Sequence, residues 1–219
     1  MSIEIVHADS LAWIADKDPR DWALLFIDPP YGQDHTTGTI AGAKFGGVKI
    51  AGDLDTSTRD QIMSWWGPGP AAVFGSLKIP AYGDPCGVLV WDKGGQSGGG
   101  DLGFPWWQCL ETISLYGKWS RGSDGKASPV IAVPPARFSD GFKDHPHQKP
   151  AVLLQAILDK APPGPVLDLT AGSGSTAVAC ARLGRPCTVV EIDERWIPTI
   201  HRRVATEGAQ RPLFAAGGT

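Results

Sequence analysis

The sequence predicts an α/β fold with a mostly parallel, twisted sheet and helices on both faces, and two features support it. Residues 23–27 (ALLFI) form a continuous apolar run that ends at Asp28, and residues 87–91 (GVLVW) form another. Continuous apolarity is typical of a strand covered on both faces, as in a parallel sheet. The last third of the chain alternates strand (165–169), glycine turn, helix (175–184), strand (187–192) and a helix from Asp193, an order that predicts parallel strands.

Shorter signals predict the remaining elements. Apolar patterns and turn residues indicate strands at 3–7, 111–117 and 129–134, and helices at 11–15 (capped by Ser10), 58–66 (ended by Gly67) and 151–161. Pro150 is expected at the first position of the last helix, whose inner face would carry Val152, Leu153, Ile157 and Leu158. Pro198 is unfavourable within the helix expected from Asp193.

Size and composition indicate one soluble globular domain. The 219 residues suffice for a single core, and 42% hydrophobic with 20% charged residues is an ordinary globular balance. No apolar run approaches the roughly 20 residues of a membrane-spanning helix, and the N-terminus lacks the features of a signal peptide. The four cysteines form no CxxC pair, so we expect free thiols, no metal site and a cytoplasmic protein.

The net charge of -3 does not indicate a nucleic-acid-binding protein, but the charges are distributed unevenly. Phosphate binding needs a local basic face rather than a basic protein. One stretch with such an excess carries Lys118, Arg121, Lys126, Arg137, Lys143 and Lys149 against three aspartates. A solvated basic loop explains this stretch equally well on charge alone.

Asp28-Pro29-Pro30-Tyr31 follows a buried strand. In an open α/β sheet, ligands bind beyond the carboxyl ends of the strands. Two prolines stiffen the turn and remove two N–H donors, so a carboxylate and carbonyl oxygens together could accept hydrogen bonds from an amino group. Tyr31 offers a flat face on which a planar ring could stack. The alternative is a strand-ending turn with an incidental aromatic residue.

Residues 166–176 (VLDLTAGSGST) form a strand that runs into a glycine turn and a helix. Gly172 and Gly174 permit a close approach of backbone to a ligand, and Ser175 or Thr176 could cap the helix. Glu191 ends the next strand, where an acidic side chain commonly binds ribose hydroxyls. Its alternative role is to cap the last helix, although Asp193 is better placed for that. Together these features predict a nucleotide-like cofactor.

A third motif, His145-Pro146-His147-Gln148-Lys149-Pro150, directly precedes a helix. Two histidines without a third ligand nearby do not favour a metal site. Polar entry into the helix is the simplest interpretation.

Taken together, the three motifs resemble the DNA amino-methyltransferases, in the subgroup whose catalytic motif precedes the cofactor motif. The resemblance spans nearly the whole chain and implies the Rossmann-like fold of methyltransferases that use S-adenosylmethionine. It implies catalytic roles for Asp28, Pro29, Pro30 and Tyr31. It implies cofactor binding by Asp9, Asp168, Thr170, Ala171, Gly172, Gly174, Glu191, Gln148 and Lys149. Lys93 and Glu111 lie in segments similar to the family's middle strands.

The resemblance implies methylation of an exocyclic amine in duplex DNA, with the target nucleotide flipped out of the helix. An aspartate at position 28 favours adenine N6, whereas relatives that act on cytosine N4 more often have serine there. Alternatives are an RNA or protein amino-methyltransferase, which usually has the opposite motif order, and a catalytically silent DNA-binding module. A nicotinamide-dependent oxidoreductase would need an early GxGxxG, which the sequence lacks.

Two departures from the family are visible. Thr170 stands where the family often has phenylalanine, and the middle segment is short. We therefore expect one methyltransferase domain over residues 1–219 with a short target-recognition insertion within 93–143, helped by a long loop at 32–55. The enzyme is expected to be a monomer or homodimer without a membrane partner, and a cognate restriction enzyme could accompany it.

Overall fold

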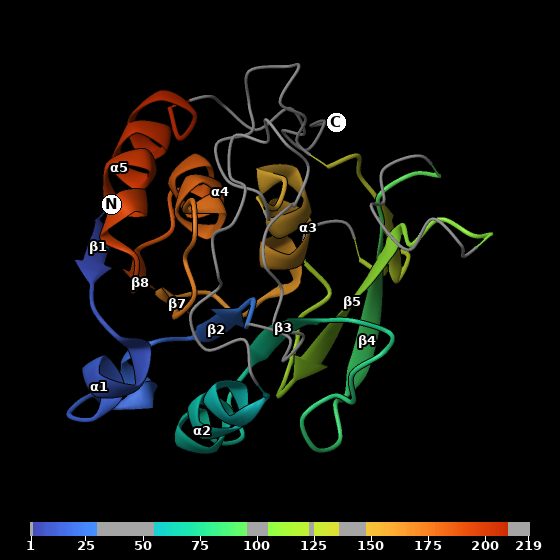
Figure 1. Ribbon diagram of the computed structural model, residues 1–219, viewed down its shortest axis with the longest axis horizontal. Coiled ribbons are helices and arrows are strands. Elements are labelled where there is room, and N and C mark those ends of the chain that lie inside the picture. The colour runs from blue at the N-terminus through green and yellow to red at the C-terminus, as the bar shows by residue number, and fades with distance from the viewer. Residues whose placement is uncertain (1, 30–54, 96–104, 123–124, 136–147, 210–219) are drawn as a thin grey trace.

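The sheet forms the centre of the computed structural model, which describes residues 2–29, 55–95, 105–122, 125–135 and 148–209. Eight described strands lie in the order β1-β8-β7-β2-β3-β5-β4-β6 (Figure 1). Their bounds are β1 Ile3–His7, β2 Leu24–Ile27, β3 Ala71–Gly75, β4 Gly87–Asp92, β5 Leu110–Tyr116, β6 Val130–Ala132, β7 Val166–Asp168 and β8 Cys187–Glu191.

The sheet is mostly parallel, as the sequence predicts. The pairs β1–β8, β7–β8, β2–β7, β2–β3 and β4–β6 are parallel, whereas β5 runs antiparallel to β3 and β4. The carboxyl ends of β2, β3, β4, β7 and β8 and the start of β5 therefore meet at one edge. This arrangement brings the residues that follow these strands together.

Helices cover both faces of the sheet (Figure 1). They are α1 Ser10–Ile14, α2 Ser57–Trp66, α3 Ala151–Lys160, α4 Ser175–Leu183 and α5 Ile197–Thr206, with 3-10 turns at Pro19–Asp21 (η1) and Glu194–Trp196 (η3). Phe26 and Phe74 pack with α3, α4 and α5, while Ile27 and Leu167 pack on the opposite face with α1 and α2. The alternation follows the two-residue period of a strand.

Strand β3 was not predicted from the sequence. Its five residues, AAVFG, are nearly all buried, but the segment is short and follows Gly-Pro pairs that read as the end of a helix. It completes the centre of the sheet between β2 and β5. Tertiary pairing thus overrides a local signal that favours a turn.

Several helix starts differ from the prediction by one residue. Asp9, not Ser10, caps α1, and Ser10 instead donates a hydrogen bond to the Leu169 carbonyl. Pro150 is the N-cap of α3 rather than its first residue. Gly174 caps α4 without a side-chain bond, so the predicted capping by Ser175 or Thr176 is wrong.

The buried face of α3 also differs slightly from the prediction. Leu153, Ile157 and Leu158 are buried as expected, but Leu154 is buried and Val152 is only half-buried. The observed buried face is therefore rotated slightly about the helix axis relative to the predicted one, and Leu154 rather than Val152 packs into the core.

The last helix begins later than expected. Asp193 caps the turn η3, and α5 starts at Ile197, which places Pro198 in its first turn. The N–H groups of the first helical turn have no acceptor within the helix. Pro198 lacks this N–H without removing a hydrogen bond, so it is compatible with the helix.

The four cysteines are free thiols, as expected, and Cys180 and Cys187 are buried. Within the described ranges, no helix has the length and apolarity needed to span a membrane.

Gly174 and Gly184 provide a matched test of the glycine turn. Both have left-handed φ angles, +79° and +68°, but a Cβ on Gly174 would lie 2.7 Å from Cγ2 of Ile200, while one on Gly184 would meet open space. We expect Gly184→Ala to cost about 1 kcal/mol of unfolding free energy through backbone strain. Gly174→Ala should cost about 1–3 kcal/mol more through overpacking. Urea unfolding followed by circular dichroism measures both, and equal losses would contradict the close packing.

Candidate functional site

The carboxyl edge of the sheet gathers most of the site residues predicted from the sequence. Asp28 follows β2, Thr170 follows β7, Glu191 ends β8, and Asp9 follows β1. Pro30, Tyr31, His145 and His147 lie outside the described residues. The edge corresponds to the position where open α/β sheets bind ligands.

Thr170 joins the turn after β2 to the turn after β7. The backbone N–H of Asp28 donates to Oγ1 of Thr170 at 2.7 Å, and the N–H of Thr170 donates to Oδ1 of Asp168 at 2.9 Å. The threonine hydroxyl can in turn donate to the same Oδ1, 3.5 Å away. The residue that departs from the family pattern therefore makes a polar link that phenylalanine could not make.

The side chain of Asp28 pairs with Lys149. Oδ2 of Asp28 lies 2.9 Å from Nζ of Lys149, which lies 2.9 Å from Oε2 of Glu111, and Lys93 donates to the other oxygen of Glu111. The ammonium of Lys149 also faces the rings of Phe74 and Trp91, 5.0 and 5.7 Å from their centroids. Lys149, which is buried, thus belongs to an ionic cluster with the half-buried Asp28, Glu111 and Lys93.

The charges of this cluster oppose the effects of burial on its pKa values. Burial works to lower the pKa of Lys149, but Asp28 and Glu111 raise it above its usual value. Burial works to raise the pKa of Glu111, but Lys149 and Lys93 hold it below its usual value. The paired, charged forms of Lys149 and Glu111 are therefore the stable ones at neutral pH.

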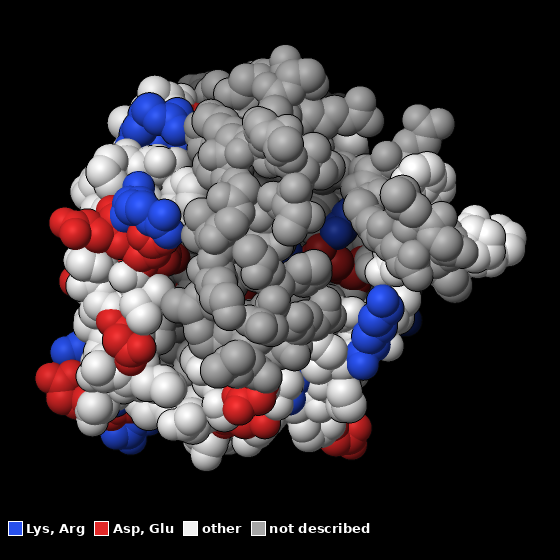
Figure 2. Space-filling model, in the orientation of Figure 1, with Lys and Arg blue, Asp and Glu red and all other residues white. Residues whose placement is uncertain are grey.

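Lys149 does not contribute to a basic surface, contrary to its place in the basic stretch of the sequence. Its side chain is 9% exposed, whereas Lys118, Arg121 and Lys126 are exposed. Arg137 and Lys143 lie outside the described residues. Basic and acidic side chains are interspersed among the described residues on the face shown in Figure 2, so this part of the surface offers no distinct phosphate-binding area.

Glu191 holds the glycine turn. The backbone N–H of Gly172 donates to Oε2 of Glu191 at 2.6 Å, and that of Asp193 donates to Oε1 at 2.8 Å. Burial raises the pKa of Glu191, although these two hydrogen bonds counteract the effect. A carboxylate oxygen has two lone pairs, so Glu191 can hold the turn and still accept hydrogen bonds from a ligand.

Asp9 and Gln148 have partly structural environments. Oδ1 of Asp9 accepts the N–H of Ala12 at 2.9 Å and so caps α1. The pairing of His7 with Glu191 places Asp9 beside the end of β8. Gln148 is buried next to Lys149. Cofactor binding by these residues stays a prediction.

Arg203 is a buried support that the sequence analysis missed. Its side chain, 1% exposed, donates from Nη1 to both the carbonyl and the hydroxyl of Ser173 at 2.9 Å, and from Nε to Glu207 at 2.7 Å. Helix α5 therefore braces the glycine turn. A signal was present in the i, i+4 spacing of Arg203 and Glu207, but a surface pair has the same spacing.

Lys93 and Glu111 were likewise not among the predicted site residues. Lys93 directly follows the largely apolar β4, and Glu111 lies at the start of β5; a charge at a strand boundary was the available signal. Their meeting depends on the antiparallel register that pairs Trp91 with Glu111. That register cannot be read from the sequence.

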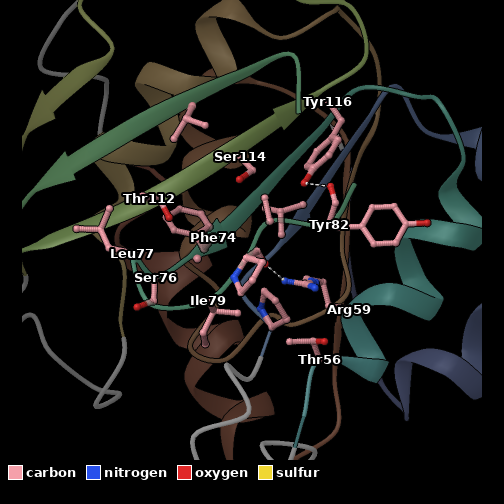
Figure 3. A pocket seen from close by; sticks show the side chains of 16 residues that line it. Thr56, Arg59, Phe74, Ser76, Leu77, Ile79, Tyr82, Thr112, Ser114 and Tyr116 are labelled. Atoms are coloured by element: carbon pink, nitrogen blue, oxygen red, sulfur yellow. Dashed lines mark hydrogen bonds between the residues drawn. The ribbon is translucent and has the colours of Figure 1, made fainter. Parts of the chain in front are cut away.

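A cavity of about 200 Å³ lies beside Pro29, between α2, β3 and β5 (Figure 3). Arg59, whose Nη1 donates to the Pro80 carbonyl at 2.7 Å, forms one wall, and Tyr116, which donates to the Tyr82 carbonyl at 2.7 Å, forms another (Figure 3). Of the two described residues in the segment 28–31, Pro29 lines the cavity and Asp28 does not. The cavity therefore adjoins the motif from the α2 side of the sheet.

The part of the chain that the structure describes holds no group of three His, Cys, Asp or Glu residues suited to a metal ion.

The titration of Asp168 leads to a prediction about stability. Burial raises its pKa from 3.8 to about 6. Between these values the folded state keeps a proton that the unfolded state loses, so stability falls as the pH rises through this window. The ionised form costs on the order of 3 kcal/mol above pH 6. Asp168→Asn should therefore raise the unfolding free energy at pH 8 and have little effect near pH 4.

Urea titrations of wild type and Asp168→Asn at pH 4, 6 and 8 test this, with the exposed Asp16→Asn as control. A variant that is less stable than wild type at pH 8 would show that the ionised carboxylate stabilises the fold.

Comparisons with known proteins identify the fold and the family of the chain. The structure is similar to that of the M1.HpyAVI–SAM complex (TM-score 0.64, 19% identity, 92% of this chain and 100% of that chain). It is also similar to PvuII DNA methyltransferase, described as cytosine-N4-specific (0.65, 14%, 93% and 86%). A third similar structure is TTHA0409 from Thermus thermophilus, a putative DNA modification methylase complexed with S-adenosyl-L-methionine (0.55, 17%, 95% and 97%).

These likenesses establish the fold, which is that of S-adenosylmethionine-dependent methyltransferases. The family model described as DNA methylase, of the N6/N4 type, matches residues 89–202, more than half of the chain. The chain therefore belongs to the N6/N4 family of DNA methylases.

Proposed function

We propose that this DNA methyltransferase transfers a methyl group from S-adenosylmethionine to the N6 amine of adenine in duplex DNA. The observation that carries the proposal is the position of Asp28. It lies at the carboxyl end of β2, and its backbone N–H donates a hydrogen bond to the side chain of Thr170, in the turn that leads to Gly172 and Gly174. An acceptor for an amine and a turn suited to a nucleotide-like cofactor are thus directly connected.

The acidic side chains of the site fit this cofactor. Carboxylates of Asp9, Asp168 and Glu191 follow or end three neighbouring strands, β1, β7 and β8. S-adenosylmethionine carries an ammonium and two ribose hydroxyls, which can donate hydrogen bonds to carboxylates, and a sulfonium whose positive charge carboxylates attract. Ile192, 47% exposed, adds an apolar surface next to Glu191. Two of the similar structures contain this cofactor.

Asp28 and Pro29 would act on the amine. The lone pair of adenine N6 is delocalised into the ring, so the nitrogen is a poor nucleophile. Hydrogen bonds from the amine to the Asp28 carboxylate and the Pro29 carbonyl favour a pyramidal nitrogen with a localised lone pair. The cofactor, held by Asp9, Asp168 and Glu191, would supply an electrophilic methyl group to this nitrogen, and the methylated nitrogen would then lose one proton to solvent by way of the Asp28 carboxylate. Catalysis then rests on positioned acceptors, with no covalent enzyme intermediate.

Access to the amine requires that the target nucleotide leave the DNA helix. We assign stacking on the flipped base to Tyr31. The cavity beside Pro29 lies next to this motif on the α2 side. DNA contacts are assigned to residues 32–55 and to the parts of 93–143 outside β5 and β6, which belong to the sheet. Trp106 and Trp107, 75% and 63% exposed, provide stacking surfaces within that region.

Cytosine N4 is the second candidate target. PvuII DNA methyltransferase, which has a similar fold, is described as cytosine-N4-specific. Asp28 favours adenine, because relatives acting on cytosine more often have serine at this position.

We expect a monomer or homodimer, and a cognate restriction enzyme as a further partner.

Incubation with duplex DNA and methyl-labelled S-adenosylmethionine, followed by nucleoside chromatography, tests the reaction and the base. We expect label in N6-methyldeoxyadenosine. Label in N4-methyldeoxycytidine would keep the chemistry and overturn the base. No label in any nucleoside, with cofactor binding intact, would overturn the substrate and direct the same assay to RNA and protein.

Variants of Asp28 and Glu191 should separate the two halves of the site. Asp28→Ala should lower kcat by about 100-fold or more, because an acceptor at the reacting amine is lost, while the cofactor Kd changes little. Glu191→Ala should raise the cofactor Kd by about 10–100-fold through lost charge-assisted hydrogen bonds. Single-turnover kinetics and calorimetry measure these quantities, with the exposed Asp16→Ala as control. A joint loss of both in either folded variant would contradict the separation.

A further inference from the structure

Four charged side chains of alternating sign form a row that begins at Asp28. It continues through Lys149 and Glu111 to Lys93, with 2.9 Å between the charged atoms at each of the first two contacts. The four residues come from separate segments: the ends of β2 and β4, the start of β5, and the residue before the N-cap of α3. Two acids and two lysines make the row neutral overall.

The environment of the row makes chance pairing of surface charges a poor explanation. The side chains of Lys149, Glu111 and Lys93 are 9%, 18% and 18% exposed. Lys149 faces the rings of Phe74 and Trp91. A lysine in such a place is costly unless it is paired, and the two carboxylates pair it on both sides.

We propose that Lys149 is a positioning residue that keeps Asp28 ionised and fixes the orientation of its carboxyl group, while Glu111 and Lys93 hold Lys149 in place and cancel its charge. The inference rests on the proposed function, in which Asp28 accepts hydrogen bonds from the target amine. It differs from the cofactor-binding role that the family resemblance implies for Lys149.

The charges around Asp28 show why such a cation is needed. Asp168 at the end of β7 and Glu191 at the end of β8 are carboxylates of the same edge, and the charge of Asp28 itself acts on Asp168. Like charges favour protonation of one of the group. A protonated Asp28 would be a weaker acceptor for the hydrogen bond from the amine, so Lys149 opposes the loss of its charge.

Glu111 balances the positive charge of Lys149. An unbalanced ammonium close to the site would repel a cationic cofactor. Lys149 also lies close to the glycine turn proposed to bind the cofactor, because its backbone carbonyl accepts a hydrogen bond from Oγ of Ser175, in the first turn of α4, at 2.7 Å. With Glu111 and Lys93 in place, the row provides a cation for Asp28 without adding net charge.

The first experiment reads the Asp28 carboxyl directly in the cofactor-free protein. Protein with 13C-labelled aspartate carboxyls is titrated by NMR, and the Asp28 resonance is identified by its loss in Asp28→Asn. In Lys149→Met the titration of this carboxyl should move upward by about one pH unit or more, because an adjacent cation is removed. Lys149→Arg should restore the wild-type position.

Lys17→Met is the matched control. Lys17 also pairs with a carboxylate, Asp16 at 2.9 Å, and faces an aromatic ring, that of Trp13 at 5.5 Å. It belongs to the segment after α1 rather than to the row. The Asp28 titration should be unchanged in this variant.

Glu111→Gln moves the same observable in the opposite direction. It removes a nearby negative charge and leaves Lys149 to Asp28 alone, so the Asp28 titration should move downward. This variant also serves if Lys149→Met does not fold. An Asp28 titration that is unchanged in the folded Lys149→Met, or in Glu111→Gln when the former is unfolded, would overturn the proposal.

Kinetics then distinguish positioning from cofactor contact. In Lys149→Met the acid limb of the kcat profile should move to higher pH, with partial recovery of kcat as the pH rises and a cofactor Kd within about 3-fold of wild type. A cofactor Kd raised about 10-fold or more with an unmoved profile would overturn the inference in favour of direct cofactor contact. If the wild-type protein methylates no DNA while the NMR titrations move as expected, the inference about Lys149 is upheld and the proposed function is overturned.

Discussion

Several buried or half-buried carboxylates lie together at the carboxyl edge of one sheet, and the site is organised around the free-energy cost of keeping them there. Parallel strands end side by side, so Asp28, Asp168 and Glu191 converge, and the antiparallel β5 adds Glu111. Each charged form loses hydration. Glu191 is compensated by two backbone N–H groups and Glu111 by two lysines. Asp168 has hydrogen bonds from Thr170 and Thr176, yet its pKa is still raised to about 6.

The same compensating groups connect the two halves of the site. Thr170 accepts from the backbone of Asp28, and Ser175 donates to the carbonyl of Lys149. Arg203 in turn bonds Ser173 and lies 3.3 Å from the hydroxyl of Ser175. The turn at Asp28 and the glycine turn are therefore held as one unit, although about 140 residues separate them in the chain. Their order along the sequence matters little for the chemistry, because β2 and β7 are neighbours in the sheet.

Much of this edge could be predicted from the sequence, because it depends on local patterns. The continuous apolar run before Asp28 and the strand that ends at Glu191 fix which residues stand at the carboxyl ends. The row beyond Asp28 could not be predicted, since it depends on the register of β4 and β5 and on the buried path of the Lys149 side chain. Composition placed Lys149 in a basic stretch, but burial and two carboxylates decide its role.

Titration behaviour separates groups that stay charged near neutral pH from a group that responds to pH. The pKa of Lys149 lies above its usual value and that of Glu111 below it, so their ion pair persists across the neutral range. Asp168, with a pKa of about 6, changes charge close to neutrality. A cation bound beside it would favour the ionised form and release a proton on binding below that pH. The proton would therefore leave from Asp168 beside the glycine turn, while the charges of Lys149 and Glu111 next to Asp28 stay constant.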